Sequence, residues 1–137
     1  MLSNQQETIK SIRFVTKTVH AFLDYPVALS LIATPFILGL GRGNPLALWL
    51  SVATGVAAFA LTFLTDHKTG VIRVLPYWLH VAIDRLVGAV FIVAPFALGF
   101  QGMDALYFWA NGLAVLLVTF VLNAPEGESH AMTPAKA

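Results

Sequence analysis

The sequence predicts an all-α protein, an integral membrane four-helix bundle built from two parallel two-helix repeats. Of the 137 residues, 58% are hydrophobic and only 11% are charged, whereas soluble globular chains are about half apolar and about a quarter charged. Four stretches are apolar over the roughly 20 residues that a helix needs to cross a bilayer. The second half of the chain also repeats the first, and these observations together define the fold class.

Net charge and cysteine content exclude several functions. A net charge of +1 leaves no basic face large enough to neutralise many phosphates, so no nucleic acid partner is expected. The chain has no cysteine, which excludes disulfides, thiolate catalysis and thiolate-ligated metals or haem. The sequence contains no phosphate-binding glycine loop and no hydrolase nucleophile motif, and an enzyme is not expected.

Turn-forming residues separate the apolar stretches. Gly39 suits a helix stop, Asn44 is an N-cap candidate for the next span, and Pro45 suits a first helical turn. Asp104 is the N-cap candidate for the last span. The predicted order begins with a cytoplasmic and interfacial N-terminal segment 1–17 and repeat 1 at 18–64, whose spans are 18–40 and 46–64. A cytoplasmic connection 65–78 leads to repeat 2 at 79–122, whose spans are 79–100 and 105–122. A disordered C-terminal tail 123–137 follows.

The two halves align without a gap at an offset of 60 residues (80 − 20 = 60), so that His20 aligns with His80 and Asp24 with Asp84. Over positions 12–61, 12 of the 50 aligned pairs are identical, and they include proline and tryptophan as well as these ionisable pairs. Each unit has two spans, so both units enter the membrane with the same polarity. The repeats are therefore predicted to be parallel, with a pseudo-twofold axis along the membrane normal that brings their first helices together.

The placement of basic residues predicts the orientation in the membrane. Five of them flank the N-terminal segment and the middle connection, and only Arg42 lies in the two short loops. Cytoplasmic segments carry the excess of Lys and Arg, so both termini are expected in the cytoplasm. The five residues are Lys10, Arg13, Lys17, Lys68 and Arg73.

Two pairs of ionisable residues lie inside the predicted spans. His20 and Asp24 are spaced i, i+4 on one helix face, and His80 and Asp84 repeat this spacing. Intramembrane ionisable groups face the bundle interior and need partners, so the four are expected to converge between the first helices of the repeats. Arg85 is offset by about 100° around the helix from Asp84 and is expected to reach Asp24 or a lipid phosphate.

Four interpretations of this polar cluster are open. The simplest is structural, with each imidazole bonded to a carboxylate so that the set fixes two helices in register. The second is haem b with His20 and His80 as axial ligands. The third is a divalent metal such as zinc bound by two His and two Asp. The fourth is proton or ion handling by the same groups. We expect the structural role, without a cofactor or metal.

Other polar and aromatic residues have simpler expected roles. His67 and His130 are expected to be solvated, Asn111 is expected to make a hydrogen bond between helices, and Ala28 and Gly88 to allow close approach of the two first helices. Four aromatic residues are expected to anchor the membrane interfaces, and two prolines to kink the first helix of each repeat. The anchors are Trp49, Trp109, Tyr77 and Trp78, and the kinks are at Pro35 and Pro95.

Five segments of the chain resemble the SPW-repeat family of small bacterial membrane proteins, in which a two-span unit carries Ser-Pro-Trp before a Leu-Gly or Phe-Gly end. These segments are 20–25, 34–39, 65–73, 80–84 and 94–99. The resemblance covers about residues 15–122, although the tripeptide that names the family is Thr-Pro-Phe in the first unit and Ala-Pro-Phe in the second. The resemblance implies the duplicated architecture and a bacterial inner membrane location. It implies no particular activity.

The expected function is therefore that of a small non-enzymatic membrane protein, a structural or accessory subunit. Its expected partners are the lipid bilayer and either copies of itself or a larger membrane complex, because a bundle this short has more outer surface than interior. The alternative is a haem, metal or ion binder that uses the paired His-x-x-x-Asp motifs. A small transporter is the third hypothesis, and the lack of a polar track through the outer half of the spans disfavours it.

Overall fold

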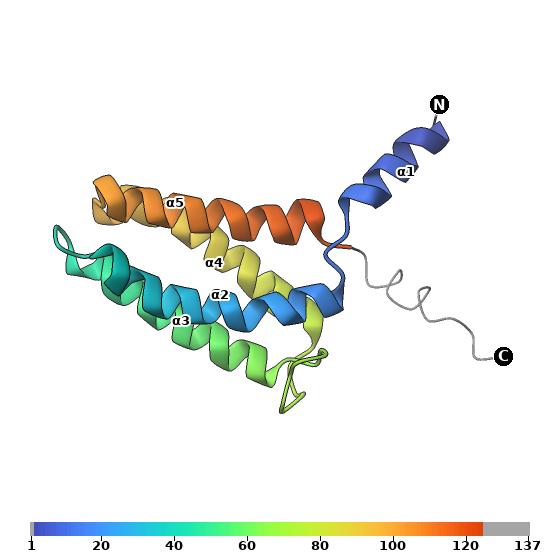
Figure 1. The fold of residues 1–137 in the computed structure, drawn as a ribbon, viewed down its shortest axis with the longest axis horizontal. Helices are drawn as coiled ribbons and strands as arrows, with labels where there is room; N and C mark the ends of the chain where they lie inside the picture. Colours follow the sequence, from blue (N-terminus) through green and yellow to red (C-terminus); the bar gives the residue numbers. More distant parts are fainter. Residues whose placement is uncertain (1, 125–137) are drawn as a thin grey trace.

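The computed structural model describes residues 2–124, and all of its named elements are helices, joined by loops (Figure 1). The elements are α1 (Leu2–Ile12), α2 (Lys17–Leu38), α3 (Pro45–Leu64), α4 (Tyr77–Leu98), α5 (Gly102–Leu116) and the π-helix η1 (Leu117–Leu122), which continues α5. Four helices are long and apolar enough to cross a membrane, namely α2, α3, α4 and α5 with η1. The predicted all-α class is confirmed, and each span begins and ends within three residues of its expected bounds.

Local chemistry accounts for most helix ends. Asn44 precedes α3 and its side chain accepts a hydrogen bond from the Leu46 amide, with Pro45 in the first turn, as predicted. Gly39 and Gly99 follow α2 and α4 in the left-handed conformation, with φ of 65° and 70°. A residue with a Cβ rarely adopts this conformation, so glycine ends both helices.

The predicted capping role of Asp104 is wrong. Helix α5 begins at Gly102, so Asp104 lies within its first turn. Its carboxylate accepts a hydrogen bond of 3.0 Å from the Gly41 amide in the other loop. The Asn44 side-chain amide likewise donates to the Leu98 carbonyl at 2.9 Å. The two loops are thus bonded to each other, which sequence spacing alone does not reveal.

The two hairpins are parallel, as predicted. The loops α2–α3 and α4–α5 lie at one end of the bundle, and the middle connection, α1 and the end of η1 lie at the other (Figure 1). Short extended segments before α2 and α4 close this second end by pairing with the exit of the opposite repeat. Val15 accepts from Ala124 and donates to Leu122, and Leu75 accepts from Asp66 and donates to Leu64.

The predicted disordered tail is therefore too long at its start. Asn123 and Ala124 are ordered against Val15, and Ala124 is buried. The rest of that tail, with His130, lies outside the described residues. The pairing depends on a contact between opposite ends of the chain, so the local composition could not reveal it.

Small residues allow the closest backbone approach, within each hairpin rather than between hairpins. A Cβ on Gly55 of α3 would lie 2.8 Å from the carbonyl oxygen of Ala28 on α2. A Cβ on Gly112 of α5 would lie 2.9 Å from the carbonyl oxygen of Gly88 on α4. The expectation that Ala28 and Gly88 bring α2 and α4 together is thus wrong, because both face the second helix of their own repeat.

The half of the bundle next to the two loops has an apolar core. Its buried residues come from all four spans and from the loops that join them, with Phe91 packed on Phe108 at 4.6 Å between ring centroids. Ser51 donates to the Leu31 carbonyl, so the Tyr107 hydroxyl donates to Ser51 at 2.8 Å and ties the repeats together. The buried core is Leu31, Leu40, Ala47, Phe91, Ala94, Phe100, Ala105, Tyr107 and Phe108.

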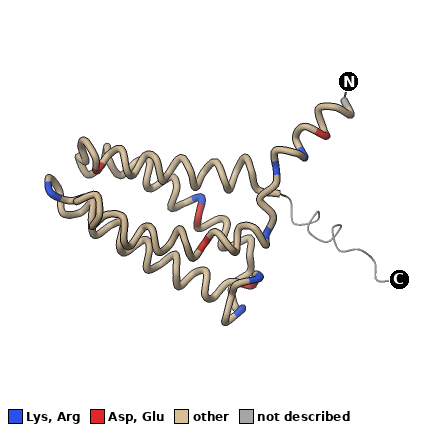
Figure 2. Tube along the Cα trace, in the orientation of Figure 1, with Lys and Arg blue, Asp and Glu red and all other residues tan. Residues whose placement is uncertain are grey.

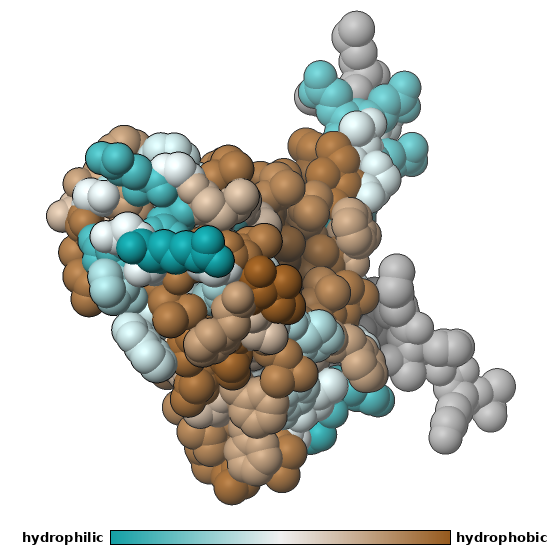
Figure 3. Space-filling view, turned by 60° about the vertical axis from the view of Figure 1, so that its left-hand side comes forward, coloured by the Kyte–Doolittle hydropathy of each residue, from teal (hydrophilic) through white to brown (hydrophobic). Residues whose placement is uncertain are grey.

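The outer surface is apolar along the spans and polar at the ends. Lys and Arg gather mainly at the ends of the bundle and on α1 (Figure 2). The face in Figure 3 is hydrophobic between the polar residues at the two ends of the bundle and on α1. Arg42 is at the loop end, opposite the five basic residues of the N-terminal segment and connection. This distribution is that of a multi-pass membrane protein.

The predicted interface aromatics divide into two groups. Trp49 and Trp78 are exposed, whereas Trp109 is partly buried and donates to the Ile92 carbonyl at 3.2 Å. Tyr77 is buried, with its ring 5.8 Å from that of His20, so it packs inside the bundle and does not face lipid.

Pro35 and Pro95 lie inside α2 and α4, as placed by the sequence. Their carbonyls accept hydrogen bonds from the amides of Leu40 and Phe100, just beyond the helix ends. A kink at either proline stays a prediction.

Candidate functional site

The paired His-x-x-x-Asp motifs meet between α2 and α4, near the end of the bundle that carries the termini. Helix periodicity places His20 and Asp24 on one face of α2 and His80 and Asp84 on one face of α4, and the pseudo-twofold turns the two faces toward each other. One ligand-type atom from each of the four residues lies within 4.8 Å of the others. The structure thus brings together the four residues that the sequence singled out.

Each imidazole lies between two carboxylates. His20 Nε2 is 2.9 Å from Asp84 Oδ2 and 3.2 Å from Asp24 Oδ1. His80 Nε2 is 3.2 Å from Asp84 Oδ2 and 3.4 Å from Asp24 Oδ2. The contacts between helices and those within a helix are equally short, so the cluster is one network and not two separate pairs. Side-chain exposure is 2–4% for the two histidines, 10% for Asp24 and 21% for Asp84.

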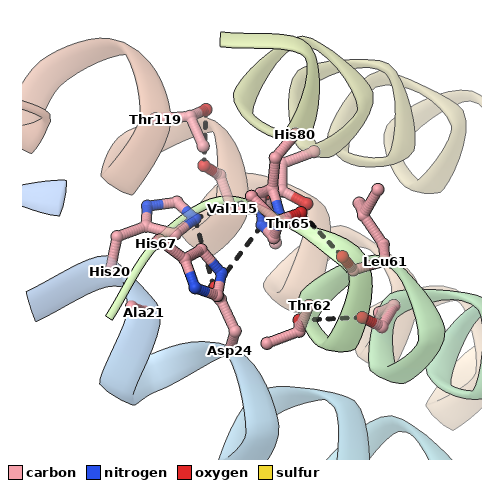
Figure 4. Close-up of polar contacts among 12 residues, drawn as sticks. His20, Ala21, Asp24, Leu61, Thr62, Thr65, His67, His80, Val115 and Thr119 are labelled. Carbon is pink, nitrogen blue, oxygen red and sulfur yellow. Dashed lines mark hydrogen bonds and ion pairs between the residues drawn. The ribbon is translucent and has the colours of Figure 1, made fainter. Parts of the chain in front are cut away.

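A third histidine joins the cluster from the middle connection. The side chain of His67 is fully buried and its Nε2 lies 3.3 Å from Asp24 Oδ2. Figure 4 shows His20, His67 and His80 around Asp24. The expectation that His67 is solvated is wrong.

The connection folds back onto α2, which explains the burial of His67. The Thr69 hydroxyl donates to the Ala21 carbonyl at 2.8 Å, and the Tyr25 hydroxyl donates to the Thr69 carbonyl at 3.0 Å. A loop has no periodicity that would reveal a buried face. The only signal available to the sequence was that this loop lies at the same end as the two motifs.

Two threonine hydroxyls contact the Nδ1 atoms of two histidines, the ring nitrogens that do not face the carboxylates. Thr65, which follows α3, lies 2.8 Å from His80 Nδ1 and donates its own proton to the Leu61 carbonyl (Figure 4). Thr69 lies 3.5 Å from His67 Nδ1. Sequence reasoning missed both threonines, because only the tertiary fold places them beside the imidazoles.

Arg85 takes no part in the ion pairs that the structure describes for Asp24 and Asp84, all of which are with histidines. Its guanidinium donates to the Thr119 carbonyl in η1 at 2.7 Å and lies 4.2 Å from the centroid of the Phe120 ring. Carbonyls in the last turn of a helix have no partner within the helix, and a cation there also suits the helix dipole. Arg85 therefore caps η1 and, among the described residues, does not pair with Asp24 as expected; a contact with a lipid phosphate stays a prediction.

A cavity of about 170 Å³ adjoins the cluster and is lined by residues from all four spans. The four residues of the paired motifs line it, together with aliphatic side chains and the polar side chains of Ser30, Thr62, Asn111 and Thr119. The amide of Asn111, however, donates to the Tyr107 carbonyl of its own helix at 2.9 Å. The expected hydrogen bond from Asn111 to another helix is therefore wrong.

The geometry separates the interpretations of the cluster. Asp84 Oδ2 lies within 3.2 Å of the Nε2 atoms of both His20 and His80. A bis-histidine haem needs its iron and macrocycle between these two nitrogens, so the arrangement does not suit haem. A small cation, by contrast, needs its ligands this close together.

Comparison with known proteins gave one match. The family model described as the SPW repeat domain matches residues 18–124, which include both hairpins and the connection. Neither the curated proteins nor the solved structures gave a match.

Proposed function

The chain belongs to the SPW repeat family, and from this premise we propose that it is a non-enzymatic structural or accessory subunit in the membrane. It would pack against copies of itself or against a larger membrane complex. One observation carries the proposal: in the most apolar 18-residue window of each span, only 22–28% of the residues are buried inside the bundle. The molecule therefore offers far more surface to lipid and partners than interior to a substrate.

Transport is the less favoured alternative. The half of the bundle next to the loops is filled by Phe91, Phe108 and other apolar side chains. The hydrogen bond between Ser51 and Tyr107 is a local polar contact in this half. In residues 2–124 the ionisable cluster lies toward the opposite end. A conducting pathway needs polar groups along its whole length.

The mass of the assembly in native lipid tests the proposal. The chain is extracted with its surrounding lipid and its mass is measured under native conditions. We expect a defined assembly heavier than the 14.8 kDa chain. A 14.8 kDa species alone at every concentration would contradict the accessory role.

Photo-crosslinking locates the contact surface. A photoreactive phenylalanine analogue replaces Phe96, which is 75% exposed, or Phe91, which is 2% exposed and serves as the matched control. We expect adducts to another chain from position 96 and only adducts within the chain from position 91. Equal patterns from the two positions would argue against a partner on this face.

We further propose that the chain lies in a bacterial inner membrane with both termini in the cytoplasm. Cytoplasmic segments of membrane proteins carry an excess of Lys and Arg, and in this chain five basic residues lie in the N-terminal segment and the middle connection. The absence of cysteine makes labelling direct. A membrane-impermeant maleimide should label Gly43→Cys but not Asp66→Cys in spheroplasts, and both after lysis. The reverse pattern would invert the orientation.

A further inference from the structure

The tautomer of His80 follows from its hydrogen bonds. The Thr65 hydroxyl gives its proton to the Leu61 carbonyl, which can only accept, at 2.6 Å. The 2.8 Å contact between Thr65 and His80 Nδ1 is then a hydrogen bond in which Nδ1–H donates. A neutral His80 therefore has a bare nitrogen, Nε2, directed at Asp24 and Asp84.

His67 repeats this arrangement. The Thr69 hydroxyl gives its proton to the Ala21 carbonyl, so it can only accept from His67 Nδ1. The lone pair of His67 Nε2 then points at Asp24 Oδ2, 3.3 Å away. Both atoms are fully buried and neither makes a hydrogen bond. A buried polar atom without a partner is unfavourable, so two such atoms facing each other indicate that a proton or a cation lies between them.

Charge leads to the same conclusion. With neutral histidines the cluster carries two buried carboxylates, and in the described part of the chain no Lys or Arg pairs with either. Burying an unpaired charge is strongly unfavourable. Two positive charges neutralise the cluster, and they come either from two protonated histidines or from one divalent cation that binds the neutral imidazoles.

We propose that His20, Asp24, His67, His80 and Asp84 form a binding site for one divalent transition-metal ion, with Zn²⁺ the best match. A five-coordinate zinc with bonds of about 2.0–2.1 Å has neighbouring ligand atoms about 2.9–3.5 Å apart. The four His–Asp separations of the paired motifs are 2.9, 3.2, 3.2 and 3.4 Å, with Asp24 contributing one oxygen to each histidine. Imidazole nitrogen selects zinc over Mg²⁺ or Ca²⁺, which prefer oxygen ligands.

Thr65 and Thr69 act as positioning residues for this site. Histidines that bind a metal almost always donate their other ring N–H to a fixed acceptor, which sets the tautomer and orients the ring. Each threonine occupies that place for one imidazole. The cavity beside Asp84 leaves the opposite side of the site accessible to water or a small ligand.

Metal titration of the purified full chain tests the proposal. Chelator-treated protein in detergent is titrated with Zn²⁺, Co²⁺ or Mg²⁺. We expect one Zn²⁺ per chain, a higher melting temperature with Zn²⁺ but not with Mg²⁺, and intense visible bands of low-coordinate Co²⁺. The double variant D24N/D84N should lose binding, and Ser51→Ala, a buried polar change in the other half of the bundle, should keep it.

A second variant separates metal binding from folding. Thr65→Val keeps all five ligands and removes only the acceptor for His80 Nδ1, so we expect zinc affinity to fall about 10–100-fold while one ion per chain still binds. Unchanged affinity would remove Thr65 from the site. Wild-type protein that binds no stoichiometric Zn²⁺, or gives only the weak octahedral spectrum with Co²⁺, would overturn the proposal even if the carboxylate variants fail to fold.

Discussion

At the scale of single residues, the middle connection matters as much as the spans. His67, Thr65 and Thr69 all come from this connection or its junction with α3, and all contact the cluster or α2. The path of the loop therefore decides the composition of the site. The loop can take this path because residue 70 is glycine, which has no Cβ to overlap the Thr65 carbonyl.

Gly70→Ala should disrupt the connection. A Cβ at this position would overlap the carbonyl oxygen of Thr65, which is backbone and cannot move cheaply. We expect a loss of about 2 kcal/mol in the free energy of unfolding, measured as a lower melting temperature in detergent.

Gly43→Ala is the matched control for that change, because nothing lies within 4 Å of a Cβ there. It should change stability by no more than about 0.5 kcal/mol. Equal melting temperatures for the two variants would mean that the connection does not adopt this tight turn.

At the scale of helices, each hairpin depends on one close backbone approach. Gly112 of α5 lies against the Gly88 carbonyl of α4, whereas the nearest atoms to a Cβ on Gly88 belong to the flexible side chain of Leu116. The two glycines share one interface but differ in what a methyl group would meet. Small residues at such positions are the usual means of close helix packing in membranes.

Gly112→Ala should therefore destabilise the protein more than Gly88→Ala. The first change pushes a methyl group against backbone and should cost about 1–3 kcal/mol, and the second is relieved when Leu116 changes rotamer. The comparison is made by thermal unfolding of both variants in one detergent. A larger loss for Gly88→Ala would contradict this packing.

At the scale of the whole molecule, polar contacts join the two repeats at both ends. The cluster joins α2 to α4 at one end, and the bond from Gly41 to Asp104 joins the loops at the other. The pairing of Val15 with Leu122 and Ala124 closes the bundle. The closest backbone packing is thus within each hairpin, whereas polar contacts at the two ends of the bundle join one hairpin to the other.

Asp24→Ala and Asp84→Ala should each lower thermal stability. Without a metal, protonated histidines pair with the carboxylates, so either change removes a partner of both His20 and His80. Polar contacts between membrane helices contribute about 0.6–2 kcal/mol each. The melting temperature of chelator-treated protein in detergent measures the effect without added metal. Unchanged values for both variants would show that the cluster does not join the repeats.

The sequence predicted much of the fold and part of the site. The offset of 60 residues identified His20, Asp24, His80 and Asp84 and the face on which they meet, because the i, i+4 rule and the duplication are both regular. It did not identify His67, Thr65 or Thr69, since a loop has no period. Arg85 and Asp104 were assigned the wrong partners, because each bonds to a backbone group on a different element.

The sequence by itself determined the number of spans, the duplication and the common polarity of the two repeats. The spans are local: in lipid each helix must satisfy its own backbone hydrogen bonds, so length and hydropathy are enough to recognise it. The duplication is visible as a constant offset, and two spans in each unit then set the polarity. Only the tertiary structure decided which groups surround Asp24, what Arg85 caps and where the connection lies. Those outcomes depend on contacts between residues far apart in the chain, and their geometry is set by how the two hairpins pack.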